Sequence, residues 1–287
     1  MGLSVCRAGR EAGPKVSFTD EDSGCAGTWS ARGTLHRSDP PHGSEPLPMS
    51  FATQNVPQTT IADSYLQALL AGDRQAARGL VEDCHTVGVA AAEILNKLVW
   101  PIMEQLQQLY KDDRISRAGL NFATRINRMV ADQLAAKLDY ADRTGKKVMI
   151  FCGDDEPEEL GGQICADLFD AAGHEVRFAG GGVPNDEVLA LIGDYRPNVL
   201  VLFATRPQGM PAVRKLIDYL RDVNANPEMQ ILCAGGIYKR AEGLAEEIGA
   251  DLYAPDAAEA VRIVEENPLR RASVDQQTVG RGRKVRK

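Results

Sequence analysis

The sequence predicts an α/β protein in which a helical bundle precedes a parallel sheet with helices on both faces. Apolar residues recur at helical spacing over residues 59–142, and from Lys146 onward short β-rich runs alternate with helical stretches. That alternation is typical of a doubly wound parallel sheet. The chain has 287 residues, of which 44% are apolar and 25% are charged, so it has the composition of an ordinary globular protein.

The first part, which we place at residues 57–143, contains four helical segments, and the first three precede residue 111. Gly72-Asp73 separates the first segment from the second. The third segment runs from about Val89 to Tyr110 and contains Pro101. A proline inside a helix removes one hydrogen-bond donor, so we expect a kink or a break near Trp100.

The fourth helical segment follows Ser116, which has the position of an N-cap. Its apolar face is expected to run through Phe122, Ile126, Met129, Val130, Leu134 and Leu138. Four amphipathic helices joined by short links predict a small antiparallel four-helix bundle.

The second part, which we place at residues 146–266, contains five β-rich runs. They are Lys147–Cys152, Glu175–Ala179, Val199–Ala204, Gln230–Ala234 and Asp251–Ala254. Five strand–helix units are typical of a flavodoxin-like five-stranded parallel sheet with the order 2-1-3-4-5. In such sheets ligands bind at the carboxyl ends of the strands. The candidate functional loops are therefore Gly153–Gly162, Gly180–Asn185, Thr205–Pro211 and Gly235–Tyr238.

Both ends of the chain have a different composition. Residues 1–48 hold seven Gly, five Pro and six Ser, so we expect a disordered leader over residues 1–56. Met49-Ser50 opens a more conventional sequence, and we interpret residues 1–48 as an over-extended gene start. Residues 267–287 are expected to form a basic disordered tail, since Pro268–Lys287 carries seven Lys or Arg and one Asp.

Composition also narrows the class of protein and its location. No run reaches the roughly 18 apolar residues of a membrane span. The net charge is −7, which argues against non-specific binding of nucleic acid or anionic lipid by the body of the chain. The six cysteines show no CxxC spacing, so we expect a reducing, cytoplasmic location with no disulfides and no zinc site.

The candidate loops lack the residues of three common chemistries. Asp154-Asp155 follows the first strand as in phosphoacceptor domains, but the third and fifth strands end without the required Asp and Lys. The acidic residues at 156, 158 and 159 would repel the phosphate of a flavin mononucleotide. No GxGxxG motif opens the first helix of the sheet domain, which argues against a dinucleotide site.

Several short motifs occur in an order that resembles one two-domain family. They are Tyr65–Asp73 (YLQALLAGD), Leu109-Tyr110 followed by Arg114-Ile115-Ser116, Glu156–Gly161 (EPEELG), Gly180–Pro184 (GGGVP) and Gly235-Gly236. Together they resemble the cobalamin (B12)-binding module, a helical cap bundle followed by a flavodoxin-like domain. Methionine synthase, corrinoid methyl-carrier proteins and light-responsive B12-dependent repressors share this module. The resemblance covers about residues 62–265.

The resemblance implies cobalamin as the cofactor and a pocket between the bundle and the carboxyl edge of the sheet. The cofactor-binding residues that it implies are Asp155, Glu156, Glu158, Gly161, Gly162, Ala204, Thr205, Gly235, Gly236, Tyr110 and Asn121. The glycines admit a second interpretation, because glycine also permits tight packing. The acids likewise suit the start of a helix without any ligand.

Three sets of cofactor-contacting residues depart from the family pattern. Glu158 stands where the family commonly places the histidine that is the lower ligand of cobalt, and a carboxylate is a harder and weaker donor to this metal. Phe203 or Ala204 stands where a serine normally meets the nucleotide tail. Tyr110 and Leu120-Asn121 stand where the repressors place a Trp and a Glu-His pair. No metal ligand is therefore assigned.

These observations lead to two hypotheses of function. The first is a non-catalytic, cobalamin- or corrinoid-binding regulatory or sensor module that acts through a protein partner or self-association. The second is a cofactor-free descendant that serves as a protein-interaction or signalling scaffold. Methyl-carrier chemistry stays open, but the missing histidine argues against it. Direct DNA binding is disfavoured because the leader shows no helix-turn-helix pattern.

Overall fold

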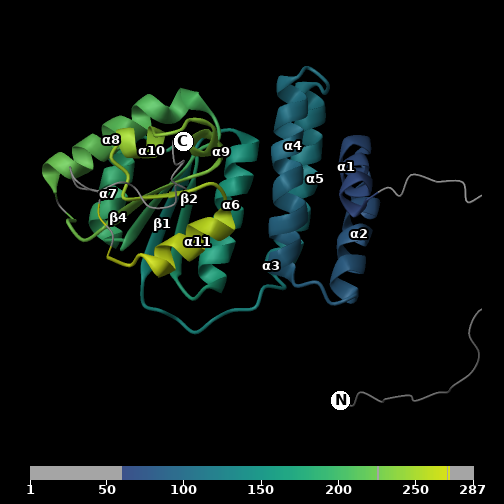
Figure 1. Cartoon of the computed structure of the whole chain (residues 1–287), viewed down its shortest axis with the longest axis horizontal. Coiled ribbons are helices and arrows are strands. Elements are labelled where there is room, and N and C mark those ends of the chain that lie inside the picture. Colours follow the sequence, from purple (N-terminus) through teal and green to yellow (C-terminus); the bar gives the residue numbers. More distant parts are fainter. Residues whose placement is uncertain (1–59, 225, 270, 272–287) are drawn as a thin grey trace, which may run out of the picture. The chain divides into compact units, whose positions relative to one another are not determined.

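A computed structural model of the chain describes residues 60–224, 226–269 and 271 (Figure 1). The predictions for the leader (1–56) and for residues 272–287 of the tail lie outside the described residues. Within the described part, no helix is both long enough and apolar enough to cross a bilayer.

The helical part has the four expected segments. They are α1 (Ile61–Ala71), α2 (Arg74–Thr86), a continuous helix made of α3 (Ala91–Ile94), η1 (Leu95–Val99) and α4 (Trp100–Lys111), and α5 (Arg117–Ala135). Gly72 ends α1 in the left-handed conformation with φ 75°, and the Asp73 side chain caps α2. Ser116 caps α5 through a 3.1 Å hydrogen bond from the amide of Gly119.

In place of the expected kink or break near Trp100, the helix is locally widened just before that residue. Residues Leu95–Val99 form a π-helical turn, in which the amide of Trp100 donates to the carbonyl of Leu95. A π turn shifts the hydrogen-bond register by one residue, so the missing donor of Pro101 does not interrupt the helix.

The expected apolar face of α5 is wrong at two positions. The Phe122 side chain is 65% exposed, and Leu138 is buried but lies beyond the end of the helix at Ala135. The buried stripe of α5 instead includes Asn127, which is fully buried. Its side chain accepts a 2.8 Å hydrogen bond from the Tyr65 hydroxyl and donates to the carbonyl of Val99. These two bonds satisfy the amide and offset the cost of burying it.

The sheet has the predicted order β2-β1-β3-β4-β5, and all its neighbouring strands are parallel. The strands are β1 (Lys147–Cys152), β2 (Glu175–Gly180), β3 (Val199–Phe203), β4 (Gln230–Ala234) and β5 (Leu252–Ala254). The helices that connect them are α6 (Glu156–Ala171), α7 (Asn185–Tyr195), α8 (Met210–Val223), α9 (Gly236–Arg240), α10 (Leu244–Glu247) and α11 (Ala257–Glu266), with a short 3₁₀ turn η2 (Pro207–Gly209).

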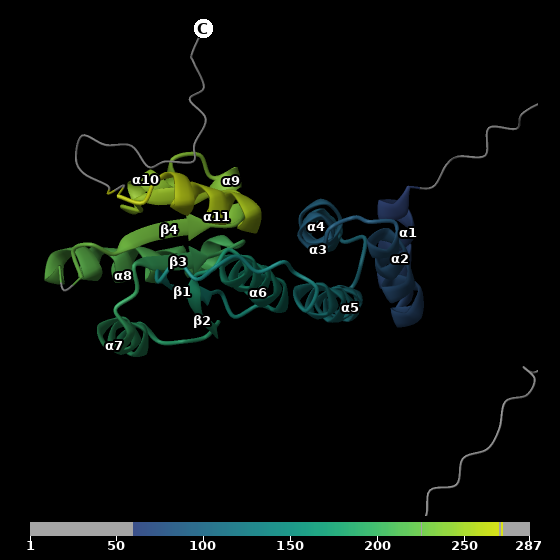
Figure 2. The same ribbon diagram turned by 90° about the horizontal axis from the view of Figure 1, so that it is seen from below.

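The helices cover both faces of the sheet (Figure 2). Alternate strand residues point to opposite faces, and they divide the core into two clusters. Val148 and Ile150 of β1 pack with α6 and α11, whereas Met149 and Phe151 pack with α7 and α8. In the same way Phe203 belongs to the α6 face at the end of β3, and Leu202 belongs to the α8 face.

The segment between α5 and β1 is held against the end of α6. The amide of Ala141 donates to the carbonyl of Ala171, and the amide of Thr144 donates to the carbonyl of Gly173, both at 2.8 Å. Gly173 has φ 86°, and a Cβ at this position would clash with the carbonyl oxygen of Asp142. Glycine is therefore required for this close passage of two chain segments.

Candidate functional site

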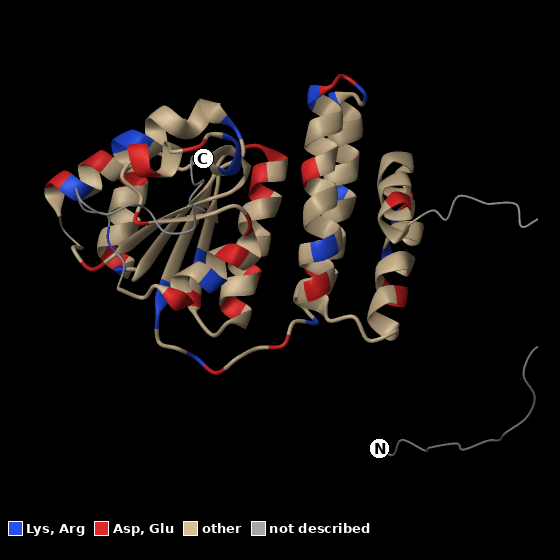
Figure 3. Cartoon of the chain, viewed as in Figure 1, with Lys and Arg blue, Asp and Glu red and all other residues tan. Residues whose placement is uncertain are grey.

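The candidate site lies where the carboxyl ends of the strands meet α4 and the start of α5. Acidic residues gather at the N-terminal end of α6, and basic residues occupy the last turn of α9 near the same edge of the sheet (Figure 3). Charged groups of opposite sign from separate loops are thus positioned to interact.

Glu158 is the central acid of this edge, and it is only 3% exposed. Its Oε1 atom accepts three hydrogen bonds from the loop after β3. The donors are the amide of Thr205 at 2.6 Å, the hydroxyl of Thr205 at 3.1 Å and the amide of Arg206 at 2.9 Å. A buried carboxylate is stable only when such donors replace its water. The residue expected at the lower-ligand position therefore serves to hold the β3–α8 loop.

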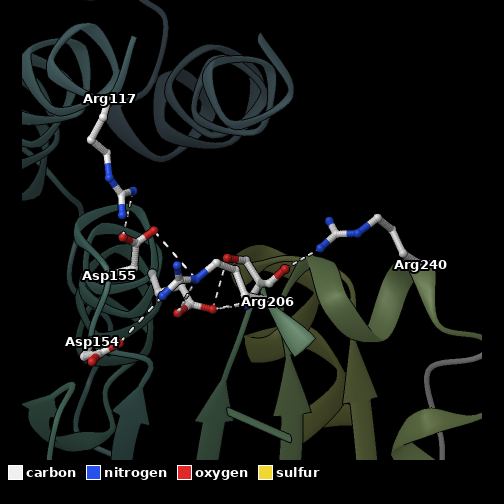
Figure 4. Close-up of polar contacts among 7 residues, drawn as sticks. Arg117, Asp154, Asp155, Arg206 and Arg240 are labelled. Carbon is white, nitrogen blue, oxygen red and sulfur yellow. Dashed lines mark hydrogen bonds and ion pairs between the residues drawn. The ribbon is translucent and has the colours of Figure 1, made fainter. Parts of the chain in front are cut away.

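Arg206 lies among three carboxylates (Figure 4). Its Nε atom is 3.7 Å from Glu158 Oε2 and 3.8 Å from Asp155 Oδ2, and its Nη2 atom is 3.7 Å from Asp154 Oδ1. Arg240 of α9 donates to the carbonyl of Thr205, and thus ties a third loop to the same cluster. We call Asp154, Asp155, Glu158, Arg206 and Arg240 the edge cluster.

Two arginines of α5 connect the bundle to the start of α6. Arg117 Nη1 is 3.3 Å from Asp155 Oδ1, and Arg128 Nε is 2.9 Å from Glu156 Oε1. Arg128 also donates to the side chain of Gln163. Two of the predicted site residues, Asp155 and Glu156, therefore pair with the bundle.

Phe203 fills the space beneath the edge cluster on the α6 face and is 2% exposed. A Cβ added to Gly161 would lie 2.5 Å from Phe203 Cζ, and one added to Gly235 would lie 3.1 Å from Phe203 Cε2. The ring also meets Trp100 of α4 edge-on, with the ring centroids 5.8 Å apart. The two glycines expected to admit a ligand thus admit the Phe203 ring.

The remaining glycines and Ala204 have packing roles in this structure. Gly162 faces Phe178, whose Cε2 would be 2.9 Å from an added Cβ. Gly235 has φ 108°, and its Cβ would clash with the carbonyl oxygen of Ala204. Ala204 is buried, and its carbonyl accepts from the amide of Ile237 at 3.3 Å. Gly236 is the first residue of α9.

A groove of about 430 Å³ remains open between α4 and the loops after β3 and β4. Trp100 and Met103 line it from the bundle, and Thr205 and Gly236 line it from the sheet domain. Its basic lining residues are Lys111, Lys239 and Arg240. Burial lowers the pKa of Lys111, and the nearby Arg240 charge lowers it further.

The two bundle residues that were predicted for the site lie near its margin. Tyr110 is partly buried near the end of α4, and the Arg117 guanidinium lies 5.3 Å from the centre of its ring. Asn121 is half-buried on α5. Neither is among the described residues that line the groove between α4 and the sheet domain.

Sequence reasoning missed the basic half of the site. Arg206 directly follows Thr205 in a loop that was singled out, and Arg240 follows the Gly235–Tyr238 loop. The signal was available as charge complementarity, because residues 154–159 after β1 contain five acids in six residues and need cations to balance them.

Comparisons with known proteins agree with this architecture. Two family models match, each described as a B12 binding domain, one over residues 146–262 and the other over residues 61–135. Dimethylamine corrinoid protein 2 of Methanosarcina acetivorans is 24% identical over 172 residues, which is 59% of this chain and 79% of that protein. Dimethylamine corrinoid protein 1 of Methanosarcina mazei is 23% identical over 197 residues, which is 68% of this chain and 90% of that protein.

A solved structure shows the same fold. The monomethylamine corrinoid protein of Methanosarcina barkeri superposes with a TM-score of 0.64 at 20% sequence identity, and the match covers 72% of this chain and 97% of that one. The chain belongs to the family of B12-binding modules, with a helical cap and a flavodoxin-like B12-binding domain. The predicted resemblance to the cobalamin-binding module, the predicted fold class and the predicted cobalamin cofactor are confirmed at the level of the family.

The residues of this chain fit that cofactor only in part. The groove beside α4 is open and lies between the bundle and the carboxyl edge of the sheet, where the resemblance places the cofactor. The space between Gly161 and Gly235, where the family resemblance places the nucleotide tail, is filled by Phe203. The residues present therefore do not fit a tail in that slot.

Proposed function

We propose that this chain is a non-catalytic, corrinoid-binding regulatory module and not a methyl carrier. The observation that carries the proposal is the bonding of Glu158, whose Oε1 is committed to Thr205 and Arg206. The position that the family gives to a ligating imidazole is here part of the loop scaffold. A corrinoid held in the α4 groove would keep its own lower ligand or water.

Binding itself is tested by colour. The purified chain is incubated with hydroxocobalamin and adenosylcobalamin, desalted, and examined by visible spectroscopy. We expect a coloured protein fraction. A colourless fraction with both compounds would contradict corrinoid binding and would favour a cofactor-free scaffold.

The absence of a protein nitrogen ligand is tested with cobinamide, which lacks the nucleotide base. Electron paramagnetic resonance of bound cob(II)inamide is recorded for the wild type and for Glu158→His. We expect nitrogen splitting of the cobalt signal only in Glu158→His. Nitrogen splitting in the wild type would show a ligating side chain and would support a methyl-carrier role.

The position of Phe203 favours a second candidate function. With this ring in the tail slot, the module has the packing of a closed protein core, which suits a cofactor-free interaction or signalling scaffold.

A third candidate, a methyl carrier, is favoured by the similarity to the two dimethylamine corrinoid proteins. The two experiments above separate all three candidates. Both the corrinoid-binding regulatory module and the cofactor-free scaffold would transmit a signal through a protein partner or through self-association.

A further inference from the structure

A second cavity of about 380 Å³ opens at the carboxyl edge of the sheet, where residues of the α7 and α8 face line it and Phe203 is also a lining residue. It lies at the carboxyl ends of β1 and β3, between the first turns of α7 and α8. These two strands mark the point at which the strand order reverses, and the crevice there is where open α/β sheets bind ligands. The volume falls within the range of small-molecule sites.

The body of this cavity, which we call the switch-point cavity, is apolar. Its walls include Phe151, Val188, Leu202, Met210, Val213 and Leu216. Cys152 is also among the lining residues, but burial raises the pKa of its thiol to about 12, and the charge of Glu159 adds to the effect. The thiol is therefore neutral near pH 7 and supplies no nucleophile.

The charged groups that line the cavity are Asp154, Glu158 and Arg206, and the uncharged polar residues Asn185 and Gln208 also line it. The buried Nε atom of Arg206 makes no hydrogen bond with any described residue. It stands 3.7 Å from Glu158 Oε2, which is too far for a direct hydrogen bond. One oxygen atom placed between them could accept from Arg206 and donate to Glu158.

We propose that the switch-point cavity binds a small, uncharged, apolar molecule that carries a hydroxyl group. A hydroxyl both donates and accepts, so it satisfies Arg206 Nε and Glu158 Oε2 together. A carboxylate ligand would meet two acids and one base among the charged lining residues and would be repelled. A hydrocarbon of the same shape would leave the buried Nε unsatisfied, which costs binding energy.

The test uses 4-fluorobenzyl alcohol as the probe and follows its ¹⁹F resonance as the full chain is added. We expect saturable binding. Binding of 4-fluorotoluene, which lacks the hydroxyl, should be weaker by about tenfold, the value of one hydrogen bond to a charged group. Binding of 4-fluorobenzoate should be weaker still. Equal binding of the three probes, or no saturable binding of the alcohol, would overturn the proposal.

Matched variants locate the probe. Val213→Trp fills the cavity from α8 and should abolish binding, whereas Lys215→Trp, at an exposed position of the same helix, should leave it intact. Ala212 is an exposed lining residue, so Ala212→Trp should block entry to the cavity. This variant replaces Val213→Trp in the test if Val213→Trp does not fold. Wild-type affinity in a folded Val213→Trp or Ala212→Trp chain would contradict the assignment.

This inference does not depend on the proposed corrinoid function. The switch-point cavity and the α4 groove have no lining residue in common among the described residues. Val213→Trp should therefore leave the corrinoid spectrum unchanged. Loss of both probe and corrinoid binding in a folded variant would show that the two are one site, and would overturn the proposal.

Discussion

The indole of Trp100 meets the ring of Phe203 edge-on at 86°, and so joins the widened bundle helix to the end of β3. Edge-to-face pairs of this kind add to the stabilisation from burial alone. The pair closes the space beneath the edge cluster from the bundle side, and Gly161 and Gly235 close it from the sheet domain. Whether this chain admits a nucleotide tail thus depends on one aromatic side chain.

Replacement of Phe203 by serine should create or tighten the binding of complete cobalamin. The change removes the ring that fills the slot between Gly161 and Gly235. We expect the affinity for cobalamin to rise while that for cobinamide, which has no base to insert, changes little. Visible titrations of both compounds measure the two affinities.

The matched control is Phe169→Ser, a fully buried phenylalanine on α6 that packs against His174 away from the slot. Both variants should lose about 3–5 kcal/mol of stability, as other large-to-small core changes do. An equal gain of cobalamin affinity in Phe169→Ser would show that the effect is loosening of the core and not opening of the slot.

Gly161→Ala should destabilise the chain through Phe203. The added Cβ would lie 2.5 Å from Cζ and 2.6 Å from Cε1 of the ring, and overpacking of this kind costs about 1–3 kcal/mol. In a Phe203→Leu background those two atoms are absent, so the same change should cost less. Urea unfolding of the wild type, Gly161→Ala, Phe203→Leu and the double variant forms a double-mutant cycle, which measures the coupling between the two positions.

Gly193→Ala in α7 is the control for this cycle, because nothing lies within 4 Å of its added Cβ. It should stabilise the chain by about 0.5–1 kcal/mol in either background, from helix propensity alone. A Gly161→Ala cost that is independent of residue 203 would refute the contact.

Removal of the Glu158 carboxylate should free the loop after β3. Glu158→Ala leaves the amides of Thr205 and Arg206 without their acceptor, and we expect a loss of about 2–3 kcal/mol. Amide hydrogen exchange at residues 205 and 206 should accelerate. Glu159→Gln, on the more exposed neighbouring acid, should change stability by less than about 0.5 kcal/mol. Unchanged exchange at residue 205 in Glu158→Ala would contradict the role assigned to this carboxylate.

The stability of the fold should depend on pH through Asp167 of α6. Burial raises the pKa of this carboxyl to about 6, and the charges of Asp132 and Asp170 contribute. Its Oδ2 atom has no hydrogen-bond partner among the described residues. Because the folded pKa lies above the unfolded value, the native state binds more protons, and stability falls as pH rises from about 4 to 6.

Asp167→Asn removes this penalty. Its stability relative to the wild type should grow by about 1 kcal/mol between pH 4.5 and pH 7.5, a figure reduced from the full shift because the group is partly exposed. Urea unfolding at the two pH values measures the difference. The exposed Asp222→Asn should show no such trend. A gain that shrank with rising pH would reverse the sign of the argument.

Most of the architecture follows from pattern. The strand order, the start of α5 at Ser116 and the turn at Gly72 were predicted because periodicity and capping are local signals. Phe122 was wrongly predicted to be buried, because hydrophobicity alone does not tell which residues of a helix face the core. Asn127 is buried instead, because two hydrogen bonds satisfy its side chain.

The candidate site was harder to predict than the fold. Gly161 and Gly235 were predicted to contact the cofactor, with tight packing as the alternative. The sequence does not say what approaches them, and in the structure it is Phe203. The position of Phe203 was noted, although only its side-chain direction decides whether the slot is filled. Arg206 and Arg240 were missed because their partners come from loops distant in sequence.

The segment tied to the end of α6 between residues 136 and 146 has a consequence for how the protein can move. With the amides of Ala141 and Thr144 bonded to that helix end, the cap cannot swing away about this segment as about a free hinge. Any opening of the cap must break these bonds or bend before Ala141, either at residues 136–140 or within α5. A protease that attacks flexible connections should therefore spare residues 141–144, although they belong to no helix or strand.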